Sequence, residues 1–276
     1  MTTSTTPRTP TRPSPVLAWV VLAAAVLQVV TPAVQALGDL GAPPSSQGDD
    51  LLITPSGYTF SIWSIIYALT IAYAVAVVVK RATGTVAPDR LLGDLALLYL
   101  GASLWIVASA LEWSWVTAAI LLVMVVIAVD AAHVAAARGP EHDGPAWLTP
   151  LARVTTGLYA GWVTAAGGLN VCSAVVGDGD LDGAAIGWQV WALVVIVLVA
   201  IGFSVLIGGS WAYAAALAWA FVGVVVAVRD TSGALVATAS VAAVVIVAVN
   251  AFLLLRRARS GVGGDRRRMS GQGGPA

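Results

Sequence analysis

The sequence predicts an all-α fold, a polytopic membrane helix bundle of eight transmembrane helices. Apolar residues make up 59% of the 276 residues and charged residues only 10%, whereas a soluble domain carries about 25% charged residues. The mean hydropathy is +0.89. The apolar residues gather in eight segments, each close to the ~20 residues that cross ~30 Å of hydrocarbon. Only helices satisfy every backbone group within such a segment.

The chain begins with a polar segment followed by a first apolar span. Residues 1–14 are rich in Thr and Pro and are predicted to be disordered, because they contain too few apolar residues to form a core. The first span covers residues 15–37. Its basic flank and the small residues at 33–36 are also typical of a cleaved signal peptide, which is the alternative to a retained helix.

Four more spans complete a first region of five helices, residues 15–176. A polar loop at 38–56 leads to them, and the short link from Glu112 to Trp115 forces the third and fourth spans into an antiparallel hairpin. The predicted spans are 57–79, 91–111, 116–137 and 150–176.

An acidic loop at 177–183 separates this region from a three-helix extension, residues 184–257. The predicted spans of the extension are 184–207, 211–228 and 234–255. Residues 258–276 are rich in Gly and Arg and are predicted to form a disordered basic tail.

The distribution of charge predicts that both termini lie in the cytoplasm and that the protein is a multi-pass protein of the cell membrane. With this orientation every basic residue except Arg229 is cytoplasmic, as the positive-inside rule requires. The opposite loops then hold most of the acids: Asp39, Asp49, Asp50, Glu112, Asp178, Asp180, Asp182 and Asp230. The asymmetry indicates both an even number of spans and their direction.

The second span begins with a Pro-Ser-Gly turn at 55–57 and continues with an aromatic stripe. Phe60, Trp63 and Tyr67 have the i, i+3, i+7 spacing of one helix face. One interpretation is an interfacial aromatic belt with ordinary packing. The other is the wall of a cavity for a flat ligand.

The fifth span presents two different faces. Gly157, Gly161 and Ala165 have the small-x-x-x-small spacing that lets a neighbouring helix approach closely. Tyr159, Trp162 and Asn170 lie on another face. An Asn within a span either hydrogen-bonds a neighbouring helix or contacts a ligand, and both interpretations stay open here.

Four ionisable residues lie within the spans, toward their cytoplasmic ends: Asp94, Asp130, His133 and Arg153. Asp130 and His133 are spaced i, i+3, and a short loop could bring Arg153 near them. A buried ion pair that fixes helix register is the favoured interpretation, and a proton relay is the alternative.

The sequence contains none of the common catalytic motifs. We find no nucleophile elbow, no phosphate-binding loop and no His-Glu-x-x-His zinc motif. The single cysteine, Cys172, and two histidines leave little for a metal site. We therefore expect neither an enzyme nor a metal protein.

The eleven tryptophans are the dominant feature of the sequence. Those near span ends are explained by the membrane interface: Trp113, Trp115, Trp147, Trp188 and Trp211. Four lie farther inside, where each indole N–H needs a partner and each ring needs packing or a ligand: Trp63, Trp105, Trp162 and Trp219.

These residues resemble the tryptophan-rich sensory protein family (TspO, also called the peripheral benzodiazepine receptor family). The family's second helix begins Pro-Pro-Gly-Trp-Val-Phe and continues to a Trp and a Tyr. Here the sequence Pro55-Ser56-Gly57-Tyr58-Thr59-Phe60 leads to Trp63 and Tyr67. Its fifth helix reads Tyr-x-x-Trp-Val-Ser-x-Ala-x-x-Leu-Asn. Matching positions are Tyr159, Trp162, Val163, Thr164, Ala166, Leu169 and Asn170.

The chain also departs from that family. Tyr58 replaces a Trp, Ala102 replaces the Asn that precedes Trp105, and Ile53 stands where many members have a loop Trp. The three helices after residue 184 exceed the family's five. The resemblance therefore indicates a divergent member with extra C-terminal helices.

The resemblance implies a bundle that binds porphyrins, haem or other flat apolar molecules under the first outer loop, with a sensory, regulatory or transport role. The residues expected to contact the ligand, between the second, third and fifth helices, are Tyr58, Phe60, Trp63, Tyr67, Trp105, Tyr159, Trp162 and Asn170.

The expected partners are the lipid bilayer and this small hydrophobic ligand, with no nucleic acid and a homodimer as one option. No cofactor is expected beyond a tetrapyrrole ligand. The alternative function is a proton-coupled secondary transporter of a small apolar metabolite, using Asp130 and His133. A membrane enzyme acting on a lipid is disfavoured by the lack of deep acid–base groups.

Overall fold

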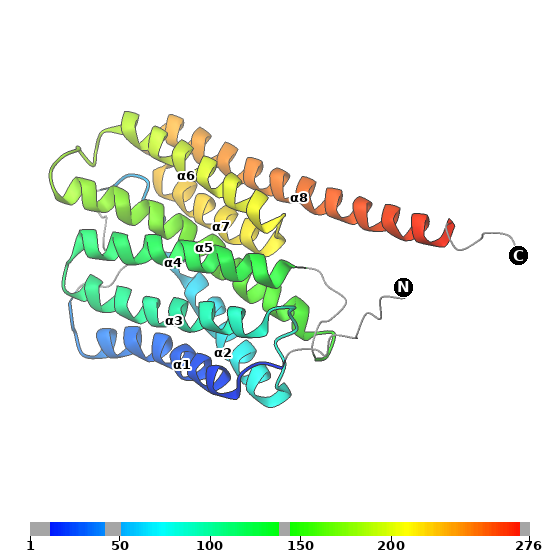
Figure 1. Cartoon of the computed structure of the whole chain (residues 1–276). Helices are drawn as coiled ribbons and strands as arrows, with labels where there is room; N and C mark the ends of the chain where they lie inside the picture. Colours follow the sequence, from blue (N-terminus) through cyan, green and yellow to red (C-terminus); the bar gives the residue numbers. More distant parts are fainter. Residues whose placement is uncertain (1–11, 42–50, 138–143, 271–276) are drawn as a thin grey trace, which may run out of the picture. The chain divides into compact units, whose positions relative to one another are not determined.

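The computed structural model describes residues 12–41, 51–137 and 144–270, the last ten of them by their backbone only. The described residues are all-helical, with no strand, and include eight helices that are long and apolar enough to cross a membrane (Figure 1). The elements are α1 (Pro15–Leu37), the 3-10 helix η2 (Gly57–Ser61), α2 (Ile62–Lys80), α3 (Pro88–Ala110), α4 (Ser114–Ala136), α5 (Leu148–Gly177), α6 (Ile186–Ile207), α7 (Trp211–Val228) and α8 (Gly233–Ser270). The predicted polytopic helical fold is confirmed.

The helix ends follow local sequence rules. Ser14 caps α1 by accepting from the Leu17 N–H, with Pro15 at the first helical position, where its missing N–H costs nothing. Ser210 caps α7 in the same way by accepting from the Tyr213 N–H. Gly208 ends α6 in the left-handed conformation, with φ at 77°.

The described residues form two compact units. The first holds residues 12–41 and 61–156, and the second holds residues 51–60 and 157–270. Helix α5 therefore contributes its first turns to one unit and the rest to the other. The sequence predicts different domain boundaries, with a five-helix region at 15–176 and a three-helix extension at 184–257. That domain assignment stays a prediction.

In the first unit α3 packs against both α1 and α4, and α1 also packs against α2 (Figure 1). The fully buried Gln28 of α1 donates a hydrogen bond of 2.9 Å to the Thr70 hydroxyl of α2. Because a buried amide needs such a partner, this bond fixes how α1 sits on α2. Helix α1 thus packs against α2 and α3 within the unit.

In the second unit α8 packs against both α6 and α7. Buried Asn250 of α8 donates to the Ser204 hydroxyl of α6 at 2.9 Å and accepts from the Ser210 N–H at 2.9 Å. One side chain therefore joins α8, α6 and the turn that precedes α7. Gly209 allows this close approach, because a Cβ there would meet the Leu253 side chain and the Asn250 carbonyl.

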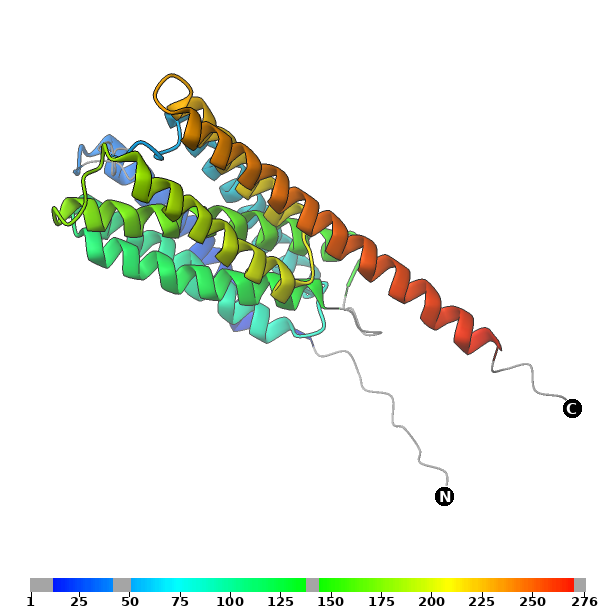
Figure 2. The same ribbon diagram turned by 90° about the horizontal axis from the view of Figure 1, so that it is seen from above.

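Helix α8 is longer than the span predicted for residues 234–255. It continues to Ser270, past the ends of α6 and α7 (Figures 1 and 2), and so enters the tail for which the composition predicts disorder. The segment holds several arginines, which are good helix formers, and no proline, whose ring would break the helix. The predicted disorder of residues 1–11 and 271–276 lies outside the described residues.

Candidate functional site

Three of the predicted ligand-contacting side chains form an aromatic cluster in the first unit. Trp63 and Tyr67 of α2 stack with ring centroids 5.3 Å apart and planes inclined by 28°. Trp105 of α3 lies 5.9 Å from Trp63 with its plane inclined by 31°. We call these three residues the stacked cluster.

The stacked cluster follows from helix geometry. Trp63 and Tyr67 are spaced i, i+4, so one ring lies above the other on α2. Trp105 is buried beneath them, at 4% exposure, whereas Trp63 and Tyr67 are only half-buried. The cluster therefore contains one buried ring, that of Trp105, and two rings that are partly exposed, those of Trp63 and Tyr67.

The second unit holds the loop 51–60, whose backbone forms hydrogen bonds with side chains of α6 and α7 and with the backbone of α7. The Ile53 N–H donates to the Gln189 side-chain oxygen at 3.1 Å, and the Ser56 N–H donates to the Gly223 carbonyl at 3.1 Å. The Trp219 indole N–H donates to the Thr59 carbonyl at 2.8 Å. We call this loop the strap.

Gly223 is the closest point between the strap and α7. A Cβ there would collide with the Thr59 side chain and approach Pro55 Cβ within 3.0 Å. Gln189 is fully buried and also donates to the Gly183 carbonyl at 2.6 Å, so its amide is held from both sides. The strap therefore packs closely on α7 where Gly223 has no side chain, and it is hydrogen-bonded to α6 through the Gln189 amide.

The strap carries two aromatic residues into edge-to-face pairs. Tyr58 packs on Trp219 with centroids 5.6 Å apart, and Phe60 packs on Trp162 of α5 with centroids 5.8 Å apart. Such pairs place the positive edge of one ring against the negative face of the other. Within the second unit, the loop is thus attached to α5 as well as to α6 and α7.

The structure places the remaining predicted residues on α5. Tyr159 is fully buried and Trp162 is 3% exposed. Asn170 is half-buried, and its amide donates to the Ala166 carbonyl on the same helix at 3.0 Å. Thr164 hydrogen-bonds the Tyr213 hydroxyl of α7 at 3.3 Å.

The predicted helical stripe from Phe60 through Trp63 to Tyr67 is partly wrong. Phe60 lies in the 3-10 helix η2, and α2 begins only at Ile62. Phe60 packs on Trp162 of α5, whereas Trp63 and Tyr67 pack on each other.

The eight predicted contact residues are therefore divided between the units. The first unit holds the stacked cluster, and the second holds Tyr58, Phe60, Tyr159, Trp162 and Asn170. That all eight line one pocket stays a prediction.

Sequence reasoning missed the residues that hold the strap. Trp219 was recognised only as an interior tryptophan, and Gln189 and Gly223 were not recognised at all. Gln189 carried a detectable signal, because an amide in so apolar a helix must find a partner. Gly223 carried none, since its neighbours come from residues far away in the chain.

Two of the ionisable residues form contacts that were not predicted. Asp130 of α4 forms an ion pair with Arg90 of α3, with contacts of 2.6 and 3.0 Å. Arg153 donates to the Ala135 carbonyl at 3.0 Å. The pairing of Asp130 with Arg90 was not predicted, and the approach of Arg153 to Asp130 and His133 stays a prediction.

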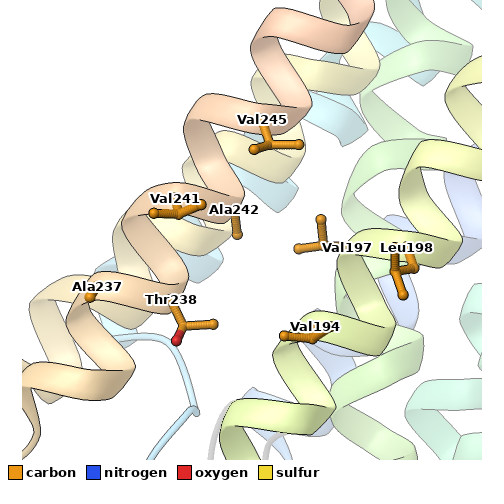
Figure 3. A pocket seen from close by; sticks show the side chains of 8 residues that line it. All are labelled: Val194, Val197, Leu198, Ala237, Thr238, Val241, Ala242 and Val245. Carbon is orange, nitrogen blue, oxygen red and sulfur yellow. The ribbon is translucent and has the colours of Figure 1, made fainter.

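Two hollows in the surface of the described residues lie one in each unit. The larger, of about 590 Å³, lies between α1 and α3 and is lined by Leu27, Val30, Thr31, Val34, Gln35, Leu40, Ile106, Val107, Ala110 and Leu111. The smaller, of about 330 Å³, lies between α6 and α8, where Val197 and Ala242 point toward one another (Figure 3). Neither is lined by a residue of the predicted aromatic pocket.

Comparison with known proteins gives the family of the chain. No curated protein and no solved structure matches it significantly. The family described as TSPO-like protein matches residues 15–253, which includes most of α8 and extends well beyond the motifs that end at residue 176. Because this match covers most of the sequence, the chain belongs to the TSPO-like protein family.

Proposed function

We propose that this multi-pass membrane protein is a receptor or carrier that binds a flat hydrophobic ligand of the porphyrin type. Family membership supports the general class. The ligand class rests on one observation, the near-parallel rings of the stacked cluster.

Near-parallel rings favour a flat partner for a physical reason. Aromatic planes attract one another in offset-stacked arrangements, worth about 0.5–1.5 kcal/mol beyond the burial of area. Trp63 and Tyr67 are half-buried and already share a common orientation. A flat macrocycle that packs against these rings would extend the existing stack.

Tryptophan fluorescence gives the direct test. Purified protein in detergent is titrated with protoporphyrin, and the quenching is compared with that of a tryptophan solution of matched absorbance. We expect saturable quenching beyond that of the free tryptophan. Quenching equal to that of the solution would contradict the proposal.

We also propose that the protein resides in the cell membrane with both termini in the cytoplasm. The described ends of the first unit support this orientation. Lys80, Arg81 and Arg90 lie at one end of α2 and α3, while Asp39 and Glu112 follow the opposite ends of α1 and α3.

A further inference from the structure

The hollow between α1 and α3 has the lining and the volume of a binding site for a small apolar molecule. Its lining is aliphatic except for Thr31 and Gln35, and Gln35 is only 6% exposed. Its volume of about 590 Å³ falls within the ~300–1,000 Å³ of typical ligand sites. The hollow lies between two helices that are long and apolar enough to cross a membrane.

The two helices end together at the mouth of the hollow. Both run in the same direction, and Gly41, just after α1, lies against the last residue of α3: a Cβ on Gly41 would collide with the Ala110 carbonyl. Leu40 and Leu111, which follow the two helix ends, line this part of the hollow. The C-terminal ends of both helix dipoles therefore place partial negative charge at one spot.

Each helix end carries an acidic residue in an unusual backbone conformation. Asp39 has φ at 49° and Glu112 has φ at 57°, both in the left-handed region that favours glycine. In both cases a Schellman-type turn closes the helix. The Leu40 N–H donates to the Gln35 carbonyl, and the Trp113 N–H donates to the Ala108 carbonyl.

Both acids carry the charge opposite to the one that a helix C-terminus favours. The backbone favours glycine there, and the helix dipole favours a cation. Arg81, the other described non-glycine residue with positive φ, follows α2 and has the charge that the dipole favours. No lysine or arginine occurs in 33–41 or 106–115 to neutralise the two acids.

From this arrangement we infer that the hollow binds a membrane lipid with an ammonium headgroup. Its acyl chain fills the space between α1 and α3. Its ammonium group lies at the mouth, where Asp39, Glu112 and two helix C-termini supply negative charge. The site involves none of the residues of the stacked cluster, so it is independent of the proposed function.

Native mass spectrometry of the full chain in detergent tests the inference. The protein is titrated with phosphatidylethanolamine and with phosphatidylglycerol of identical acyl chains. We expect the amine lipid to bind at least about fivefold more tightly, the order expected for two exposed carboxylate–ammonium contacts. Equal binding of the two lipids, or no binding of either, overturns the inference.

Variants distinguish binding of the lipid's acyl chain from recognition of its headgroup. Ala110→Trp fills the hollow and should abolish binding of the amine lipid, whereas Ala237→Trp fills the hollow between α6 and α8 and should leave the preference intact. The double variant Asp39→Asn, Glu112→Gln should keep chain binding and lose the preference. A preference that survives in this double variant overturns the inference, even if Ala110→Trp does not fold.

Glu112→Gly distinguishes a ligand-binding role from a structural one. Glycine adopts positive φ without strain, so the variant should be at least as stable as the wild type in a thermal unfolding assay. The headgroup preference should nevertheless fall. An unchanged preference would show that Glu112 only shapes the turn, and would contradict its role at the site.

Discussion

Gly161 determines how closely α5 and α7 approach within the second unit. A Cβ there would collide with the Tyr213 carbonyl and lie 2.9 Å from Ala216 Cβ. Gly157, one turn earlier, lies equally close to Ser210 and Ala212. The close helix contact predicted from the small-x-x-x-small spacing is confirmed, and its partner is α7.

Replacing Gly161 with Leu should therefore destabilise the protein. Overpacking a close contact costs about 1–3 kcal/mol, since the two backbones must separate. The measurement is the thermal unfolding midpoint in detergent. Gly202→Leu is the matched control, because nothing lies within 4 Å of a Cβ at that helical position. Equal midpoints for the two variants would contradict the contact.

A second residue-scale prediction concerns the partner of Asp130. Asp130→Arg should lower the unfolding midpoint by placing like charges beside each other, and adding Arg90→Asp should restore most of the loss. Adding Arg153→Asp instead should restore nothing. Rescue by Arg153→Asp rather than by Arg90→Asp would show that the observed pairing is wrong.

At the scale of elements, the strap depends on the two helices that hold it. Gln189, Trp219 and Gly223 all contribute to its position within the second unit. These helices follow the residues that carry the motifs of the TspO resemblance and lie within the segment that matches the TSPO-like family. The two helices thus have a clear structural role, since they bind the loop 51–60.

Gly223→Val should release the strap. The added methyl groups collide with Thr59 and Pro55, so the loop must move away from α7. Hydrogen–deuterium exchange of peptides covering 51–60 should become faster, while Gly202→Val should leave it unchanged. Unaltered exchange in Gly223→Val would indicate that the strap does not rely on this contact.

The hydropathy of the sequence predicted where the helices lie, but it did not predict which side chains of different helices contact one another. The apolar runs fixed α1, α6 and α7 nearly to the residue, because a membrane span is defined by its own composition. The pairing of Arg90 with Asp130 and the docking of Ile53 on Gln189 were not predicted. Such contacts depend on which helices become neighbours, and local sequence carries no signal for that.

At the scale of the whole molecule, the eight candidate spans of the described residues support the proposal that both termini lie on the same side. Reporter fusions after Lys80 and after the tail should report a cytoplasmic location, because the basic residues gather at those ends. A fusion within 177–183 should report the opposite side. A cytoplasmic 177–183 loop would contradict the proposed orientation.

The central claim is that the stacked cluster binds a flat ligand, and one comparison of two variants tests it most directly. Porphyrin affinity is measured from the shift of the porphyrin's own absorption band, which does not depend on the number of tryptophans. Trp63→Leu should weaken binding about tenfold, because it removes the stacking contribution and part of the contact area. Trp191→Leu, at a 70% exposed position, should leave affinity within error. Equal affinities for the two variants would contradict the claim.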